Sequence, residues 1–351
     1  MADVTIRGAG ILGLATAWTC LAKGARVRVI DPNGVASGAS GGPVGALAPH
    51  TPDQWNAKKA FQFESLILSR SFWPEVEAAS GLNTGYRRSG RIQPIAVERQ
   101  ISLAEAREEG AHTHWGAHAT WSVVGRADLP GWCPPSPTSR YIHDTLSAQI
   151  QPTLACQALA EAVVRQGGEV VREGPNEGAV IHATGWQGLI ELSDALGAQV
   201  GSGQKGQAIR VMCDAPTDAA QLFVDGLHII SHGDGSVAIG STSERDFENP
   251  TSTDAQADAL LERAQAAMPA LCGAPILSRW AGVRPRAASR APVLDRWPGR
   301  ANTFILNGGF KIGFGMAPGL ARVLTDWVLE GSDVGVPEEF RLAASLPKVS
   351  T

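Results

Sequence analysis

The chain has 351 residues, a formal net charge of −4, 44% hydrophobic residues and 18% charged residues. This composition is typical of a packed globular protein and excludes a disordered chain, while the length predicts two domains or one divided fold. A dedicated nucleic-acid binder would normally carry a basic excess, so the slightly acidic balance argues against nucleic acid as a partner.

Three further features bear on the environment of the chain. No apolar run reaches the roughly 18 residues that a membrane-spanning helix needs. The N-terminus has no basic leader, which argues against a signal peptide. The five cysteines form no C-x-x-C pair, a pattern that fits a reducing cytoplasm and offers no metal site. We therefore expect a cytoplasmic protein without a transmembrane segment or a bound metal.

The first 30 residues predict a strand, a helix and a second strand. Residues 3–7 read as the first strand, residues 10–23 as a helix that Gly24 ends, and residues 26–30 as a strand with β-branched residues at alternate positions. This order is that of a β-α-β unit at the extreme N-terminus.

The rest of the chain alternates between helical and strand patterns. In chain order we expect a Gly-rich loop over 32–49, a helix over 53–80, mixed strand and loop over 81–136, a helix over 154–166, a strand over 180–183, strands over 207–211 and 236–240, a helix over 253–268, a strand over 304–306 and a helix over 318–330.

The β-α-β unit carries a glycine motif, GAGILG, with Gly8, Gly10 and Gly13 in G-x-G-x-x-G spacing. The first glycine permits a tight turn, the second lets the backbone approach a pyrophosphate, and the third lets the helix pack closely on the sheet. Asp31 follows the second strand at the offset expected for a carboxylate that binds a ribose. Residues 201–206 (GSGQKG) share the spacing, but no strand precedes them and no helix follows, so we expect a loop there.

Four further segments accompany the glycine motif, namely GASGGPVGALAPH at 38–50, ATG at 183–185, WAGVRPRAASRAPVLD at 280–295 and GGFKIGFGMAPGLARVL at 308–324. Together they resemble the D-amino-acid oxidase and glycine/sarcosine oxidase family of FAD-dependent enzymes. The glycine-oxidase-like branch is most similar, because of the segments SGLNTGYRRSGRIQPI at 80–95 and KGQAIRV at 205–211.

The resemblance implies an α/β (α+β) fold in which a Rossmann-like FAD-binding domain carries an inserted substrate domain with a mixed sheet. The expected boundaries are 1–80, 137–196 and 279–335 for the FAD-binding domain, 81–136 and 197–278 for the substrate domain, and 336–351 for a C-terminal tail. No cysteine occurs in the C-terminal motifs, so the FAD is expected to be held non-covalently.

The resemblance also implies site residues. The expected cofactor-binding residues are Gly8, Gly10, Ile11, Leu12, Gly13, Asp31, Pro32, Ala39, Ser40, Gly45, Ala46, Leu47, Val171, Ala183, Thr184, Gly185, Gly282, Arg284, Gly309, Phe310, Lys311 and Ile312. The helix beginning near Pro318 would point its N-terminus at the pyrimidine edge of the flavin.

Three residues are candidates for a catalytic role. Arg284 matches the arginine that binds the substrate carboxylate, although Arg279, Arg286 and Arg290 lie nearby and a surface position is the alternative. Lys311 is expected to stabilise reduced flavin, to orient an anionic substrate or to assist oxygen reduction, with a solvated loop lysine as the alternative.

His228 occupies a position where the family often has a pocket-lining tyrosine, and it either touches the substrate or has a structural role. The remaining histidines of interest lack acidic or thiolate partners at useful spacing and are expected at the surface: His50, His112, His114 and His118.

The implied reaction is oxidation of the C–N bond of a small amino acid or secondary amine that carries a carboxylate, with hydride transfer to flavin N5 and O2 or a quinone as the electron acceptor. Two alternatives stay open. One is the FAD-dependent oxidase module of a tRNA-modifying enzyme, and the other is a non-catalytic or electron-transfer flavoprotein subunit, which the altered RPRAAS and GGFKIG elements allow.

Overall fold

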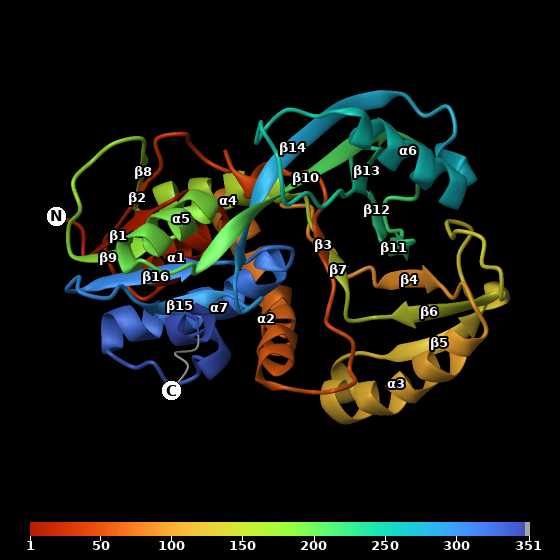
Figure 1. Cartoon of the computed structure of the whole chain (residues 1–351), viewed down its shortest axis with the longest axis horizontal. Coiled ribbons are helices and arrows are strands. Elements are labelled where there is room, and N and C mark those ends of the chain that lie inside the picture. Colours follow the sequence, from red (N-terminus) through yellow and green to blue (C-terminus); the bar gives the residue numbers. More distant parts are fainter. Residues whose placement is uncertain (348–351) are drawn as a thin grey trace.

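The computed structural model describes residues 1–347 and contains two large sheets in different parts of the molecule (Figure 1). One sheet has six strands in the order β15-β16-β9-β1-β2-β8, and all neighbours are parallel except β15 and β16. Its strands are β1 Val4–Arg7, β2 Val27–Ile30, β8 Glu169–Val171, β9 Ala179–His182, β15 Val293–Arg296 and β16 Thr303–Asn307.

Helices cover both faces of the six-stranded sheet. These are α1 Ile11–Ala22, α4 Pro152–Arg165, α5 Gly185–Leu196 and α7 Gly313–Glu330, while α2 Ala57–Ser80 packs on the outside of α4 and α7. On β16, Phe304 and Leu306 belong to the core that includes α1 and α7, whereas Ile305 packs in a separate core with Leu189 of α5. This alternation places α5 on the face opposite to α1 and α7.

The second sheet has eight strands in the order β14-β10-β13-β12-β11-β4-β6-β5, and all neighbours are antiparallel except β11 and β4. Its strands are β4 Arg91–Pro94, β5 Trp121–Gly125, β6 Arg140–Asp144, β10 Gly201–Met212, β11 Gln221–Val224, β12 Leu227–Ser231, β13 Ser236–Gly240 and β14 Ile276–Ala287. Helix α6 Ala255–Ala267 packs its Leu260 against β10, β12 and β13 in one apolar core, and helix α3 Arg99–Trp115 lies against β5.

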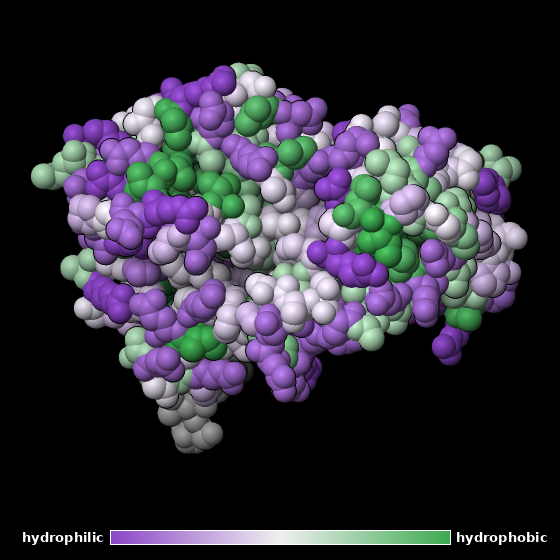
Figure 2. All heavy atoms as spheres, turned by 90° about the horizontal axis from the view of Figure 1, so that it is seen from above, coloured by the Kyte–Doolittle hydropathy of each residue, from purple (hydrophilic) through white to green (hydrophobic). Residues whose placement is uncertain are grey.

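Two connections join the regions. The long strands β10 and β14 pair with each other along most of their length and reach from the eight-stranded sheet to α5 (Figure 1). The short strands β3 Ala46–Leu47 and β7 Ala148–Gln149 form a separate pair between the two large sheets. The face seen in Figure 2 is mostly hydrophilic, and its apolar residues lie in small separate groups.

Several expected elements differ from the structure. The stretch 81–136 contains the helix α3, which the sequence did not predict because only Ala104, Ala111 and Trp115 are buried along its 17 residues. The expected loop at 201–206 is wrong, since these residues form the first half of β10 and pair with β14. Glycine has a low strand propensity, so the local pattern concealed a strand that the ladder to β14 stabilises.

The last predicted helix begins earlier than expected, at Gly313 instead of Pro318, and carries the proline inside it. Of the expected tail, residues 338–345 form two short 3-10 turns in which Phe340 and Leu342 are buried. Residues 348–351 lie outside the described part of the chain. Within that part, no helix has the length and apolar character needed to cross a membrane.

Candidate functional site

The first part of the site is a backbone cradle where β1 meets α1. Gly10 precedes the helix and no side chain caps it there, while the Ile11 amide donates to Ser40 Oγ at 3.0 Å. A Cβ on Gly13 would lie 2.0 Å from the Gly8 carbonyl oxygen, so only glycine lets α1 approach the strand this closely. The amides of the first helical turn carry the positive end of the helix dipole, which suits an anionic group.

Asp31 follows β2 beside this cradle. One carboxylate oxygen accepts from the Ala9 amide at 2.8 Å, and the other accepts from the Asn33 amide at 3.0 Å. The Asp31 amide donates to the Val171 carbonyl oxygen at 3.0 Å. These bonds fix the carboxylate at the strand end and leave lone pairs for further donors.

Predicted cofactor residues from distant parts of the chain converge on the cradle. A Cβ on Gly8 would meet the Ala183 carbonyl oxygen at 2.3 Å, and one on Gly309 would meet the Leu12 side chain at 3.5 Å. The Thr184 hydroxyl is buried and has no hydrogen-bond partner within residues 1–347. The beginning, middle and end of the chain thus contribute to one place.

Other predicted cofactor residues are positioned differently. Pro32 is exposed and its carbonyl oxygen accepts from Arg172, whereas the Leu47 side chain is buried in the core. A Cβ on Gly282 would lie 2.3 Å from the Trp280 ring, so this glycine leaves room for the indole. The remaining members lie in the turn over 39–41, just before β3 and in it, at the start of α5 and just before α7: Ala39, Gly45, Ala46, Gly185 and Ile312.

Arg284 lies in β14 and is 9% exposed. Its guanidinium donates to Ser241 Oγ at 2.6 Å and to the Thr242 carbonyl oxygen at 3.3 Å. An arginine has five N–H donors, so three of them have no acceptor among the described residues. Burial lowers the pKa of Arg284 to about 10, and the charge of Glu244 opposes this shift, so the side chain is a cation at neutral pH.

Lys311 lies close to the same strand. The amide of the preceding residue, Phe310, donates to the Pro285 carbonyl oxygen at 3.0 Å, which holds this turn against β14. Lys311 is an exposed residue, but neighbouring atoms partly desolvate its ammonium group and so lower its pKa, and the nearby charge of Arg284 lowers it further. Lys311 therefore adds a second positive charge to the region around Arg284.

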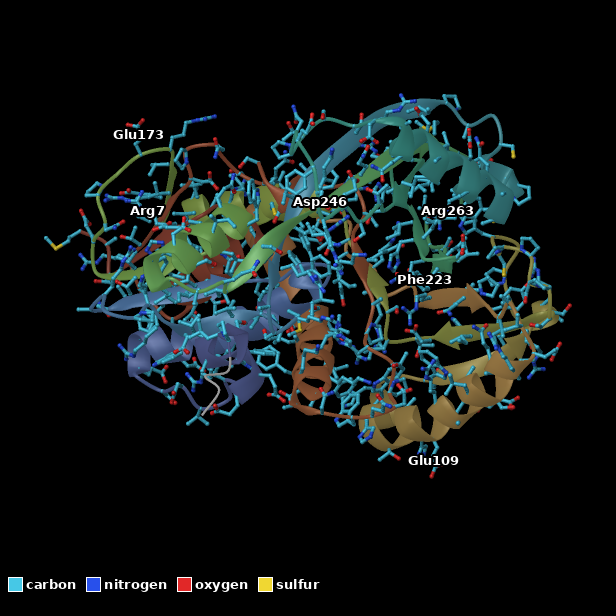
Figure 3. The ribbon with its side chains drawn as sticks, viewed as in Figure 1. Arg7, Glu109, Glu173, Phe223, Asp246 and Arg263 are labelled. Atoms are coloured by element: carbon cyan, nitrogen blue, oxygen red, sulfur yellow. The ribbon has the colours of Figure 1, made fainter. Side chains whose placement is uncertain are left out.

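His228 lies in β12, with its ring 4.7 Å from the ring of Phe223, which Figure 3 shows on the adjacent strand β11. Its Nδ1 atom is buried without a hydrogen-bond partner in the described chain. Burial lowers the pKa of His228 to about 3, and the charges of Arg91 and Lys311 contribute to this shift. The imidazole is therefore neutral at physiological pH.

The remaining histidines do not behave alike. His112 and His118 are exposed as expected. His50 is half-buried, its Nδ1 lies 2.5 Å from the Gln62 side-chain oxygen, and burial lowers its pKa, so the expected surface position is wrong. His114 is also half-buried, with its ring stacked on Trp55 at 4.3 Å, so the expected surface position is wrong for it as well. No group of three metal-ligating side chains occurs in the part of the chain that the structure describes.

The sequence did not point to the residues that hold Arg284. Ser241 and Thr242 follow β13, and Glu244 lies two residues further on. The available signal was the polar run STSE directly after an apolar strand, which is typical of a strand that ends beside a site.

The cradle fits FAD on structural grounds. It combines a helix start whose close approach to β1 requires glycine at position 13, a carboxylate fixed at the end of β2 and an unpartnered buried hydroxyl at Thr184 within the described residues. These features suit a pyrophosphate, a ribose and further polar atoms of a dinucleotide.

The comparisons with known proteins agree with this geometry. A family model described as FAD dependent oxidoreductase matches residues 3–327. The chain belongs to the FAD-dependent oxidoreductase family. This membership confirms the predicted family, an FAD-dependent oxidoreductase as the kind of enzyme, and FAD as the cofactor.

Among its relatives, this oxidoreductase is 26% identical over 375 residues to the bifunctional protein ThiO/ThiG of Trichormus variabilis, in an alignment that covers 99% of this chain and 56% of that protein. It therefore spans about half the length of this relative. It is also 24% identical over 358 residues to the glycine oxidase of Pseudomonas putida, covering 94% of this chain and 95% of that protein.

The crystal structure of glycine oxidase from Geobacillus kaustophilus has a TM-score of 0.85 to this oxidoreductase at 19% sequence identity, covering 97% of this chain and 98% of that one. At this level of identity the likeness concerns the fold. It confirms the predicted α/β fold of the family, whereas the exact domain boundaries stay a prediction.

Proposed function

We propose that this FAD-dependent oxidoreductase oxidises the C–N bond of a small primary or secondary amine that carries a carboxylate. The observation that carries the proposal is Arg284, a buried cation with two bonds to neutral oxygen atoms and three unused N–H donors. A guanidinium matches a carboxylate with two parallel hydrogen bonds, and a desolvated cation without an anion is costly. The glycine oxidase relatives support an amino-acid-like substrate.

In this proposal Arg284 binds the carboxylate and so orients the amine-bearing carbon. Bound FAD would supply the two-electron acceptor: a hydride would leave the carbon and a proton the nitrogen, and water would hydrolyse the resulting imine. His228 contributes a neutral imidazole, because its pKa of about 3 keeps it unprotonated at neutral pH. An amine that binds in its neutral form needs no strong general base. Lys311 adds positive charge that favours an anionic ligand.

The test uses a carboxylate whose binding changes the flavin absorption spectrum, with benzoate as the probe. We expect Arg284→Ala to weaken benzoate binding by more than about 100-fold, by analogy with truncated buried charge pairs, and Arg284→Lys to lose most of the affinity because the two-pronged geometry disappears. FAD content should remain normal in both variants.

Arg279→Ala is the matched control, since Arg279 lies on the same strand but is ion-paired with Asp258 at 2.7 Å. Equal benzoate affinity in wild type and Arg284→Ala would remove the central residue of the proposal. The substrate itself would then have to be sought among amines without a carboxylate.

The amine can be identified by an anaerobic screen of amino acids and N-methyl amino acids for bleaching of the flavin. Bleaching by at least one member is the expected result, and loss of that bleaching in Arg284→Ala connects it to the site. Reoxidation by air or by a quinone then assigns the electron acceptor. A flavin that no amine reduces would favour an electron-transfer role instead.

A further inference from the structure

Arg284 lies against a position of β10 that has no side chain. Gly206 pairs with Gly282 in the ladder between β10 and β14. A Cβ on Gly206 would lie 2.0 Å from one terminal nitrogen of Arg284 and 2.1 Å from the other. Any other residue here would therefore displace the guanidinium, although the strand itself could stay in place.

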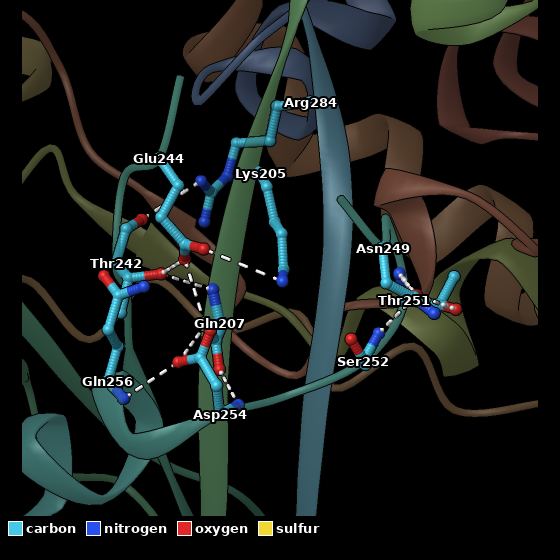
Figure 4. Close-up of polar contacts among 10 residues, drawn as sticks. All are labelled: Lys205, Gln207, Thr242, Glu244, Asn249, Thr251, Ser252, Asp254, Gln256 and Arg284. Atoms are coloured by element: carbon cyan, nitrogen blue, oxygen red, sulfur yellow. Dashed lines mark hydrogen bonds and ion pairs between the residues drawn. The ribbon is translucent and has the colours of Figure 1, made fainter. Parts of the chain in front are cut away.

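A second set of contacts holds the segment that the guanidinium binds. The Thr242 amide donates to the Gln207 carbonyl oxygen at 3.1 Å, and the Gln207 amide donates to Thr242 Oγ1 at 2.8 Å. The same hydroxyl donates to Glu244 Oε1 at 2.5 Å. Thr242 is thus tied to β10 and to Glu244 while its carbonyl oxygen accepts from Arg284 (Figure 4).

Glu244 is in turn fixed to β10 by its backbone and its side chain. Its amide and carbonyl form both hydrogen bonds of a bridge to Lys205, at 2.9 and 3.0 Å. Its second carboxylate oxygen lies 3.7 Å from Lys205 Nζ, and the two side chains are 10% and 5% exposed. Gln207 Nε2 also donates to Glu244 Oε1 at 3.2 Å. A carboxylate that is buried and bound on both sides has little freedom to move.

Lys205 and Gly206 are adjacent in β10, so they face opposite sides of the sheet. Lys205 lines a hollow of about 830 Å³ together with Glu244, Asp246 and Asp254, whereas Gly206 faces Arg284. In Figure 3, Asp246 lies where β10 and β14 leave the eight-stranded sheet. Glu244 therefore lies with Lys205 on the face of β10 opposite to the face that Arg284 contacts.

We propose that Glu244 is a positioning residue for Arg284, acting through Thr242, and that Gly206 supplies the space in which the guanidinium is held. This inference rests on the proposed role of Arg284 in carboxylate binding. A bidentate arginine must be held to within about 0.5 Å of its productive position. The position of Arg284 is then set jointly by two segments, KGQ at 205–207 and STSE at 241–244.

The experiment measures benzoate affinity, FAD affinity and the melting temperature of the holoenzyme. We expect Glu244→Ala to weaken benzoate binding at least 10-fold while FAD affinity changes less than 2-fold. Glu244→Gln keeps an oxygen that can accept from Thr242 and Gln207, so it should restore most of the benzoate affinity. Gly206→Ala should weaken benzoate binding at least 10-fold with a nearly normal melting temperature, because the atom displaced is the end of a flexible side chain.

Asp258→Ala is the matched control, because Asp258 is a carboxylate that contacts β14 elsewhere, through an ion pair with Arg279 at the exposed end of the strand. It should leave benzoate affinity unchanged. Should Glu244→Ala not fold, Thr242→Val removes the hydroxyl link and keeps the Glu244–Lys205 pair, and it should weaken benzoate binding about 3- to 10-fold.

A double-mutant experiment distinguishes a positioning role of Glu244 from a purely structural one. In an Arg284→Ala background, Glu244→Ala should have no further effect on benzoate binding, because the residue it positions is gone. Folded Glu244→Ala or Thr242→Val with unchanged benzoate affinity would overturn the positioning role while leaving the proposed function intact. Unchanged affinity in Arg284→Ala would instead overturn the proposed function itself.

Discussion

The two sheets of this oxidoreductase present their ligand-facing groups in different ways. At the six-stranded sheet these groups are mainly backbone amides and carbonyls, and the close approach of α1 to β1 depends on the missing side chain of Gly13. At the eight-stranded sheet the expected groups are side chains, above all Arg284, which Ser241 and Thr242 orient, and His228, whose ring lies against Phe223 and whose Nδ1 has no partner among the described residues. The first region should therefore be sensitive to added atoms, and the second to changes of charge and hydrogen bonding.

Among the variants that test this difference, Gly13→Ala should have the largest effect, which is a loss of FAD affinity. The added Cβ would lie 2.0 Å from a backbone carbonyl oxygen, which cannot move without separating α1 from β1. Such overpacking costs about 1–3 kcal/mol, so FAD affinity should fall by up to roughly 100-fold. Flavin fluorescence titration measures the change.

Gly38→Ala is the control for this variant, since a Cβ there meets no atom within 4 Å. With excess FAD, Gly13→Ala should recover normal benzoate affinity, because the eight-stranded sheet is untouched. Loss of benzoate affinity in the saturated variant would show that the two regions are not separable in this way.

A smaller effect, confined to acidic pH, is expected for His228→Phe. The pKa of His228 is lowered from 6.5 to about 3, so between these values the unfolded chain binds more protons than the folded one. Stability must then fall as pH drops below 6.5, by about 2 kcal/mol per such histidine at pH 5. In His228→Phe the loss of stability that His228 causes at acidic pH should be absent. The loss that His232 causes should remain, because burial lowers the pKa of that histidine to about 4.

Chemical denaturation at pH 7.5 and pH 5 measures the difference. Gly13→Ala serves for comparison, because it should show the same dependence on pH as the wild type. An unchanged loss of stability in His228→Phe would indicate that the imidazole is solvated and titrates normally.

The smallest effect is expected for Lys311→Met. Lys311 forms no ion pair among the described residues, and its charge acts on Arg284 without direct contact. Screened interactions of this kind contribute less than about 1 kcal/mol, so benzoate affinity should fall about 2- to 5-fold and the difference should shrink at high salt. Identical titrations for wild type and variant would favour a solvated lysine on a loop.

The same difference between backbone groups and side chains explains how much of each region could be predicted from the sequence. The glycines of the first β-α-β unit have a fixed spacing because the backbone must meet itself there, so Gly8, Gly13 and Asp31 could be found from local pattern alone. Arg284 was found through its motif, but its partners Ser241 and Thr242 come from a strand that joins it only through the sheet. These partners are brought together by the register of strands that are far apart in the sequence, so a local sequence pattern does not reveal them.

The misassigned elements have related causes. The strand at 201–206 is rich in glycine because the guanidinium of Arg284 and the ring of Trp186 lie against it, so tertiary contacts override strand propensity. Helix α3 is exposed over most of its surface and lacks the apolar periodicity that marks a helix. The start of α7 was placed at Pro318 because proline favours the first turn, whereas here it lies inside the helix.

The order of the strands in the six-stranded sheet bears on how the chain is completed during synthesis. Val4 in β1 pairs with Ala179 in β9, and β9 in turn pairs with Thr303 and its neighbours in β16. Contacts so distant in sequence are slow to form, and early strands wait with unpaired edges for their partners. The six-stranded sheet, although it contains β1, can therefore be completed only after β16 has left the ribosome.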